Sequence, residues 1–451
     1  MVKLDPSPTD VYRRRFSERD ATRLLWRAGF GPGPGDEARL AALGLDGAVA
    51  SLTRPSGPAR LIGAAPHDDD GQPLDPTSVY GDDHCWWLDR MVRSDQQLTE
   101  RMTLIWHSWF ATSEQASNAQ LMIGQNWMMR SHALGNFHTL LLDVTKDPAM
   151  LLWLNGSSNN KWSPNENYGR EMLELFTLGQ GRGYGQEDVH QNARALTGFT
   201  NEWNDGGPSN FRYEPSLHDD GVKKIFGHKG RFNWIDSCRL AVQHPDHPSF
   251  FVNKLWGYFV GAPAPAATQR ALERAYVQGG YEVRPIVEAI LRHPIFYEGP
   301  RMVNPPVVFC AGLLRASRQT ITTTSWAWVA HLTGQILFQP PNVSGWDYAL
   351  WLDTSRWVGR LTAVNTALTN HVLKSDKYPF GIEETAGQAL AHALDFWGNP
   401  VLSATATENL LALARKLLRG QTQDYEQVSA RNLRQNALRA LIPLTPDWQT
   451  C

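Results

Sequence analysis

Apolar side chains recur every three or four residues through a long stretch of this sequence, from about residue 82 to residue 178. That spacing places them on one face of a helix, because an α-helix completes a turn in about 3.6 residues. The same periodicity returns at residue 248 and continues to about residue 439. The clearest run consists of Trp86, Leu88, Met91, Leu98, Met102, Ile105 and Trp106. The sequence therefore predicts an all-α fold, a large multi-helix domain with irregular loop insertions and at most minor β-structure.

Two local signals indicate where helices begin. Ser17 followed by Asp20 has the pattern of a capping box, in which the two side chains bond each other's backbone N–H groups. Asp147 followed by Pro148 places proline at the first helical position, where its missing N–H costs nothing. We expect helices to start directly after Ser17 and Asp147.

Irregular segments interrupt the helical pattern. Residues 54–80 are rich in Pro, Gly and Asp, which is typical of a surface connection. Residues 199–235 and 337–354 also break the periodicity, and the aromatic content of 199–235 favours an ordered insert with short β-like pieces. The predicted division is an N-terminal helical cap and loop (1–80), a main helical domain with the candidate site (81–375) and a C-terminal helical extension (376–451).

Charge and composition exclude several classes of partner. Lys and Arg total 43 against 45 Asp and Glu, a net charge of -2, so a broad electrostatic grip on nucleic acid or an anionic membrane is not expected. The sequence shows neither a signal peptide nor an apolar run of membrane-spanning length, so we expect a cytoplasmic protein. The 4 cysteines have neither zinc-ribbon nor CxxC spacing and are interpreted as free thiols.

The densest group of polar residues lies between Pro164 and Gly179, which act as start and stop signals for a helix of about three turns. At about 100° per residue, five polar side chains fall within an arc of roughly 140°. They are Glu166, Asn167, Arg170, Glu171 and Glu174. Crowded carboxylates can hold different pKa values, so that one serves as a general acid and another as a base or nucleophile. The alternative interpretation is a solvated face with pairs of opposite charge four residues apart.

Other candidate residues lie outside this helix. His107 is flanked by Trp106 and Trp109, and it is either a core histidine or an acid, base or metal ligand. The chain contains 18 tryptophans, whose flat faces pack cores but also stack on ligands such as sugars. The irregular insert contains His218, Asp219, Asp220 and Lys223, which either form a turn or present an imidazole and a carboxylate to a pocket.

Several long motifs resemble a bacterial family known as domain of unknown function 1800. The run from Pro164 to Gly179 is similar to its Pro-Asn-Glu-Asn-aromatic-small-Arg-Glu-x-x-Glu-Leu-Phe-x-x-Gly signature. The resemblance covers roughly residues 17–375. It implies kinship, but the family has no reaction that could be transferred to this chain. Many of its members look exported, and this sequence differs from them in showing no signal segment. Further matching segments are 23–32, 100–113, 132–154, 188–199, 218–232, 247–260 and 337–351.

These residues favour a hydrolase that cleaves glycosidic bonds in a carbohydrate-containing substrate. Glu166 or Glu171 would protonate the leaving oxygen, and another carboxylate of the same face would act as base or nucleophile. Arg170 would tune the pair, and the polar groups that bind substrate would come from the same helix and the insert. The expected substrate-binding residues are Asn165, Asn167, Arg170, Trp106, Trp109, Trp346, Asp219, Asp220 and Lys223, beside the candidate catalytic residues Glu166, Glu171, Glu174, His107 and His218.

Two other functions stay open at this stage. One is a metal-dependent hydrolase or oxidoreductase that uses His107 with Glu171 and Glu174 as ligands. The other is a non-catalytic binding or scaffold protein, in which the Glu–Arg stripe holds helices together. No cofactor is predicted, a bound metal stays open, and a protein partner is unknown.

Overall fold

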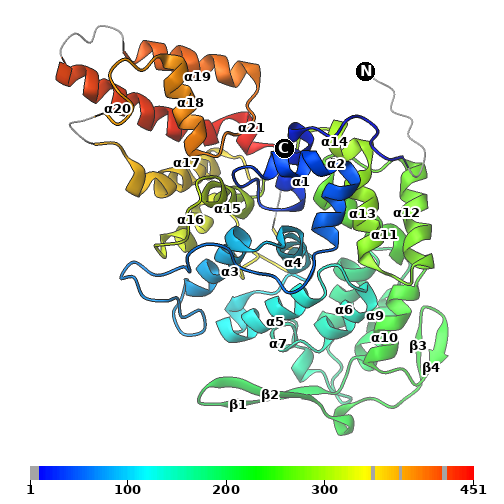
Figure 1. Ribbon diagram of the computed structural model, residues 1–451. Helices are drawn as coiled ribbons and strands as arrows, with labels where there is room; N and C mark the ends of the chain where they lie inside the picture. The colour runs from blue at the N-terminus through cyan, green and yellow to red at the C-terminus, as the bar shows by residue number, and fades with distance from the viewer. Residues whose placement is uncertain (1–9, 347–350, 375–377, 419–423) are drawn as a thin grey trace.

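The computed structural model describes residues 10–346, 351–374, 378–418 and 424–451. Within these residues it is a helical protein with two small β-hairpins (Figure 1), which confirms the all-α prediction. None of the described helices combines the length and the apolar character needed to cross a membrane. The first helices are α1 (Glu18–Ala28), α2 (Asp36–Thr53), α3 (Asp82–Arg93), α4 (Gln97–Trp109), α5 (Ala119–Ser131), α6 (Phe137–Thr145), α7 (Pro148–Trp153), α8 (Glu166–Glu171) and α9 (Gln186–Ala195).

The second half of the chain continues the helical pattern. The helices at 386–396, 404–416 and 424–441 lie together at one edge of the molecule, at the upper left of Figure 1. The elements are α10 (Trp234–Gln243), α11 (His247–Phe259), α12 (Ala266–Gln278), α13 (Val283–Arg292), α14 (Pro294–Glu298), α15 (Pro306–Ala316), α16 (Ser325–Thr333), α17 (Thr354–Leu368), α18 (Ala386–Phe396), α19 (Ala404–Lys416), α20 (Asp424–Leu441) and α21 (Pro446–Gln449).

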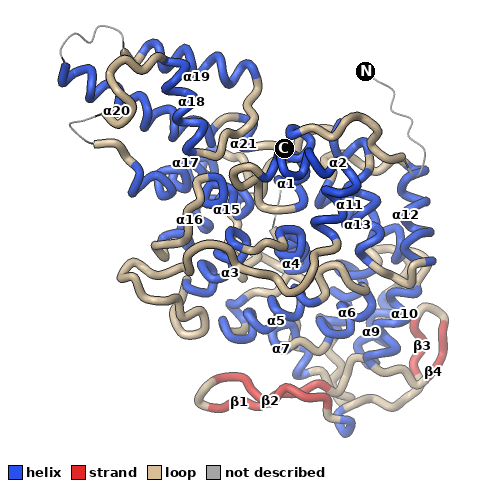
Figure 2. Tube along the Cα trace, in the orientation of Figure 1, coloured by secondary structure: helices blue, strands red, loops and turns tan. Residues whose placement is uncertain are grey.

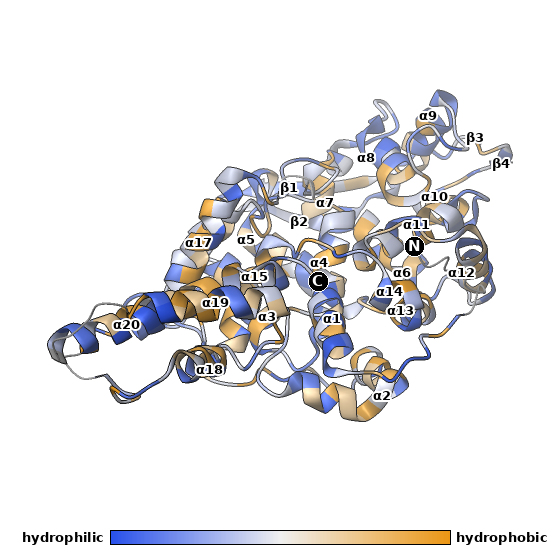
Figure 3. Cartoon of the chain, turned by 90° about the horizontal axis from the view of Figure 1, so that it is seen from above, coloured by the Kyte–Doolittle hydropathy of each residue, from blue (hydrophilic) through white to orange (hydrophobic). Residues whose placement is uncertain are grey.

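The helices are amphipathic, as the periodicity predicts. In α13 the buried residues Val283, Ile286, Val287 and Ile290 follow the spacing of one helix face. Figure 3 shows hydrophobic and hydrophilic bands on the same helices. Both predicted helix starts are confirmed, since Ser17 and Asp20 form a capping box and Asp147 caps α7 with Pro148 in its first turn.

Two large clusters of apolar side chains form the interior. The first contains Trp106, Trp109 and Phe137 and lies among α4, α6, α11 and α13. The second contains Trp87 and Phe309 and lies among α3, α15, α17 and α18. Helices α3 and α4 are adjacent, so the two clusters meet along them.

Helix α1 contributes to both clusters. Leu24 and Leu25 belong to the first cluster, and Trp26 belongs to the second. The ring of Trp26 packs edge-on against Trp448 of α21, with 5.7 Å between ring centroids. The segment at 18–28 is therefore integrated with the rest of the helical body.

The irregular insert carries the β-structure (Figure 2). Strand β1 (Phe199–Asn204) pairs antiparallel with β2 (Gly207–Tyr213), with an irregularity between Thr200 and Glu202. Strand β3 (Lys223–Ile225) pairs with β4 (His228–Gly230). The insert is ordered, as its aromatic content indicates.

The acidic helix differs from the expected regular geometry. Helix α8 ends at Glu171, and a π-helical turn, η3 (Met172–Thr177), continues it. The N–H of Leu178 donates to the carbonyl of Leu173 at 2.9 Å, a bond five residues back along the chain. Because this turn is wider than an α-helical turn, Glu174 does not follow Glu166 and Glu171 at the angle that a regular helix gives.

Asp147 gives the fold a pH-dependent element. Its carboxylate is buried and accepts from the Nε2 of Gln125 at 2.7 Å and from the N–H of Met150 at 3.0 Å. Burial raises the pKa of Asp147 to about 7, although these hydrogen bonds lower it in part. The unfolded chain releases this proton at about pH 3.9. The contribution of Asp147 to stability is therefore full at low pH and is lost as pH rises towards 7.

We expect Asp147→Asn to change stability little at pH 4 and to stabilise the protein at pH 8 by a few kcal/mol, at about 1.4 kcal/mol per pKa unit. Asparagine keeps the acceptor oxygen and removes the charge. Urea unfolding at both pH values measures the effect. Asp353→Asn is the matched control, because Asp353 caps α17 in the same way but is exposed. An equal gain from both substitutions would contradict the burial argument.

Candidate metal centre

The carboxylates of the predicted acidic face have two different environments. Glu166 accepts hydrogen bonds from neighbouring side chains, whereas Glu171 lies beside the like charge of Glu174. The carboxylate of Glu166 accepts from Arg170 at 2.8 Å and from the Nε2 of Gln186 at 2.8 Å, and it lies 3.4 Å from the Nδ1 of His190 on α9. Burial raises the pKa of Glu166, but the bonds from Gln186 and Arg170 outweigh that effect and lower it. Glu166 is therefore held in the ionised form, which does not suit a general acid.

Glu171 has the opposite shift. Its side chain is half-buried, and burial together with the charge of Glu174 raises its pKa. Asn165 caps α8 by accepting from the N–H of Asn167 at 2.9 Å, and Asn167 itself is exposed. Glu171 with Glu174 is the part of the predicted face that keeps the electrostatics of an acid–base pair.

The predicted aromatic cleft residues lie in the interior. Trp106 and Trp109 are fully buried, and their ring N–H groups donate to the carbonyls of Ala133 (3.1 Å) and Phe176 (3.0 Å). His107 is also buried, and burial lowers its pKa to about 3. The structure therefore does not bring these side chains to an open surface beside Glu166.

His107 lies in an aromatic box. Its ring centroid is 5.2 Å from Trp87, 5.9 Å from Phe338 and 5.5 Å from Trp346. Trp346 is 5% exposed. His107 and Trp346 are thus brought together, within the second apolar cluster and away from α8.

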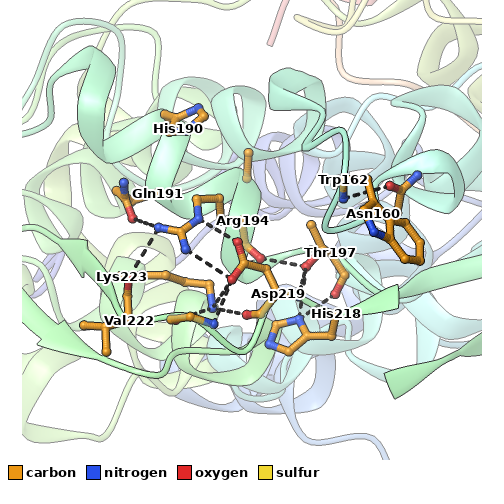
Figure 4. Close-up of polar contacts among 12 residues, drawn as sticks. Asn160, Trp162, His190, Gln191, Arg194, Thr197, His218, Asp219, Val222 and Lys223 are labelled. Atoms are coloured by element: carbon orange, nitrogen blue, oxygen red, sulfur yellow. Dashed lines mark hydrogen bonds and ion pairs between the residues drawn. The ribbon is translucent and has the colours of Figure 1, made fainter. Parts of the chain in front are cut away.

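The polar residues of the insert form a closed network (Figure 4). The carboxylate of Asp219 accepts two hydrogen bonds from Arg194 of α9, at 2.7 and 3.1 Å. Lys223 donates to the carbonyl of Asp219 and, at 3.1 Å, to that of Gly221. This network fastens the insert to α9.

His218 belongs to the same network, and Asp220 does not. The Nδ1 of His218 lies 2.9 Å from the carbonyl oxygen of Thr197. The side-chain hydroxyl of Thr197 also accepts a hydrogen bond from the N–H of Asp219. His218 is buried, whereas Asp220 is exposed. The bonding of His218 is that of a structural residue.

A different cluster has the geometry of a metal site. Asp83 and His84 lie in the first turn of α3, and Glu114 begins the short helix η1 (Glu114–Ala116). The Nε2 of His84 is 3.7 Å from the Oδ2 of Asp83 and 3.6 Å from the Oε2 of Glu114. All three potential ligand atoms lie within 4.8 Å of one another. Ligand atoms bound to one ion at about 2.1 Å lie roughly 3 to 3.5 Å apart, so small side-chain movements would complete a coordination shell.

Two of the three facing atoms of this cluster are buried without hydrogen bonds, whereas the half-buried Glu114 accepts one from Gln339 at 3.4 Å. Asp83 is 0% and His84 is 2% exposed. Among the described residues, neither the Oδ2 of Asp83 nor the Nε2 of His84 has a hydrogen-bond partner. Leaving such atoms unpaired costs about 1–3 kcal/mol each, and more for a charged group. A cation between them would remove that cost.

The backbone before α3 orients the carboxylate of Asp83 towards His84 and Glu114. Gly81 has φ of 94°, a left-handed conformation that turns the chain into α3. Its N–H donates to the Oδ1 of Asp83 at 3.1 Å, which leaves Oδ2 directed at the cluster. Burial raises the pKa of Asp83, and the charge of Glu114 raises it further while His84 opposes the shift. Two carboxylates that share a site disfavour each other's charged form, and a bound cation would offset this repulsion.

A small pocket of about 40 Å³ opens beside His84. On its wall, Tyr80 and Trp328 are each 62% exposed, and their ring centroids are 6.3 Å apart. The Tyr80 ring lies 5.6 Å from the His84 ring. Helices α3 and α16, which are neighbours (Figure 1), both contribute residues to the pocket. The pocket is lined by Tyr80, Gly81, His84, Thr324, Ala327, Trp328, His331 and Ile336.

Sequence patterns did not identify this centre. Asp82, Asp83 and His84 are adjacent in the chain, but Glu114 follows thirty positions later and no spacing rule joins them. The available signal was the Gly-Asp-Asp-His run at 81–84, at the start of the stretch with helical periodicity.

The fold and the site define a largely helical protein with a candidate centre of one imidazole and two carboxylates. A family model described as a protein of unknown function (DUF1800) matches residues 23–450, and the chain belongs to this family. The match extends beyond residue 375 and includes the C-terminal helices. No curated protein and no solved structure matches the chain.

We expect the apo protein to bind one equivalent of a divalent transition metal such as Mn²⁺ or Zn²⁺, because mixed imidazole and carboxylate ligands suit these ions. Asp83→Asn and Glu114→Gln should each weaken binding at least tenfold. Calorimetric titration and the metal-dependent rise in melting temperature measure this.

Glu166→Gln is the matched control, since it removes a carboxylate that also lies near a histidine. Tight binding that survives in Asp83→Asn but disappears in Glu166→Gln would move the metal site to α8.

Proposed function

We propose that this protein is a metal-dependent hydrolase in which Asp83, His84 and Glu114 bind one divalent metal ion, and that its substrate contains carbohydrate. One observation carries the proposal: two of the three candidate ligand atoms are buried without hydrogen-bond partners, and His84, which supplies one of them, lines an aromatic pocket. A metal ion bound there would polarise a substrate oxygen and lower the pKa of a bound water towards neutrality. The cytoplasmic location stays a prediction.

The pocket residues suit the binding of the reacting group and proton transfer to it. The volume of about 40 Å³ admits water or one small polar group, at roughly 10–15 Å³ for each water. The reacting group would enter this space, where Thr324 and His331 supply polar side chains. His331 is the residue that we assign to proton transfer on the substrate side.

The substrate class follows from the aromatic residues at the pocket mouth. Tyr80 and Trp328 are too exposed to serve the core. Ring faces of this kind stack on the apolar faces of sugars, while the phenol O–H and indole N–H bond hydroxyls. The body of the substrate would therefore lie outside the pocket, against these two rings.

We expect the metal-loaded protein to hydrolyse a member of a panel of aryl glycosides, oligosaccharides and acylated sugars, and chelation to abolish that activity. Trp328→Ala should lower kcat/KM about tenfold, because a stacked ring contributes about 0.5–1.5 kcal/mol beyond its area burial. Trp203→Ala is the matched control, since Trp203 is 71% exposed on strand β1 and does not line the pocket.

Activity that survives both chelation and Asp83→Asn would exclude the metal-dependent mechanism. Metal binding that raises the melting temperature, with no turnover on any panel member, would instead favour the scaffold function.

A second candidate rests on the raised pKa of Glu171. A half-buried carboxyl beside Glu174 has the electrostatics of a general acid that cleaves a glycosidic bond with a second carboxylate. In this mechanism the reaction needs no metal ion.

For this candidate, we expect Glu171→Gln to reduce glycoside hydrolysis at least a hundredfold without a change in melting temperature, and chelation to have no effect. Glu187→Gln, a carboxylate on the neighbouring α9, is the control. Full activity in Glu171→Gln would remove this residue from the mechanism.

A further inference from the structure

Phe338 has a backbone conformation that bulky residues rarely adopt. Its φ is 60°, in the left-handed region, and its side chain is fully buried. It lies in a turn in which the N–H of Gln339 donates to the carbonyl of Ile336 at 3.2 Å. Glycine or asparagine normally occupies such a turn position, because a Cβ there meets the backbone. The surrounding packing therefore holds Phe338 in a conformation that the free chain would avoid.

Both the backbone carbonyl and the ring of Phe338 contact the candidate metal centre. Its carbonyl accepts the N–H of Glu114 at 2.9 Å, which fixes the start of η1. Its ring packs 6.3 Å from the His84 ring and 4.7 Å from the Trp87 ring. The next residue, Gln339, places its Nε2 3.4 Å from the Oε2 of Glu114. One turn thus contacts two of the three ligands, which come from separate parts of the chain.

We propose that Phe338 is a positioning residue of the metal centre: its left-handed turn fixes Glu114 and the His84 ring at coordinating separation before an ion binds. This inference rests on the proposed metal site and adds how that site is preorganised. In the observed arrangement, the His84 Nε2 and the Glu114 Oε2 are 3.6 Å apart, at ion-pair distance and close to the separation of two ligands bound to one ion. A relaxed turn would move the carbonyl that holds Glu114 and widen this separation.

The protein contains a matched comparison. Tyr281 is also aromatic, has φ of 69°, and its carbonyl accepts the N–H of Phe137 at 3.0 Å at the start of α6. None of the three candidate ligands contacts Tyr281 through a bond or ring contact within the described chain. Tyr281 is therefore a left-handed aromatic residue with the same backbone role at a structural position.

The test measures Co²⁺ and Zn²⁺ binding to the full-length apo protein, with Phe338→Gly and Phe338→Leu set against Tyr281→Gly and Tyr281→Leu. Glycine frees the turn, and leucine keeps the backbone restraint but removes the ring. Residues that orient ligands typically contribute 10–100-fold to metal affinity. We expect both Phe338 variants to bind 10–100-fold more weakly and to change the visible absorption spectrum of bound Co²⁺. The Tyr281 variants should lower the melting temperature and leave affinity and spectrum unchanged.

If Phe338→Gly does not fold, Phe338→Leu and Gln339→Ala carry the test by the same two measurements. Wild-type affinity and an unchanged Co²⁺ spectrum in the Phe338 variants would overturn the positioning role and leave the metal site intact. A wild-type protein that binds no ion would overturn the metal site, and with it the role of Phe338.

Discussion

A carboxylate and an imidazole, Asp83 and His84, are buried at the start of α3 with their facing atoms without hydrogen bonds, and the half-buried carboxylate of Glu114 lies beside them. The functional interpretation of the whole molecule depends on this arrangement. Burying a carboxylate oxygen without a hydrogen bond is costly in a folded protein, even where the other oxygen of the group accepts one, as the Oδ1 of Asp83 does from the N–H of Gly81. Asp83 and Glu114 are neighbours around one His84, so hydrogen bonding within the cluster cannot satisfy both. Such an arrangement persists in a folded protein when the rest of the chain enforces it.

Packing in the two apolar clusters holds the three side chains in this arrangement. Asp83 and His84 begin α3, whose Trp87 and Leu88 belong to the second apolar cluster. Glu114 follows α4, whose Trp106 and Trp109 belong to the first. The turn at Phe338 comes from a third part of the chain and contacts both sides. The ligands therefore lie where the two clusters meet, and their separation is set by long-range packing.

This origin explains which features the sequence could predict. Helix periodicity and the caps at Ser17 and Asp147 are local, because a few neighbouring residues determine them, and these predictions are confirmed. The angular argument for the acidic face assumed a regular helix, and the π-turn after Glu171 is not encoded by any spacing rule. The metal centre combines three segments that are far apart in the sequence, at residues 83–84, 114 and 338. A phenylalanine in the left-handed conformation at the third segment is not predictable from the sequence, because glycine or asparagine normally occupies such a position. High tryptophan content was equally ambiguous, since Trp106 and Trp109 pack the core while Trp328 lies at the pocket mouth.

Three polar clusters in this protein show that charge density alone does not identify a functional site. Glu166 with Arg170 and Asp219 with Arg194 are both rich in charge, and the carboxylate in each accepts good hydrogen bonds from its partner. Their electrostatics are satisfied within the chain, so they fasten α8, α9 and the insert together. At Asp83 and His84 the hydrogen bonding is incomplete and solvent is excluded. A polar group that the protein buries but does not satisfy retains its capacity to bind something else, which is why the smaller cluster is the better candidate for chemistry.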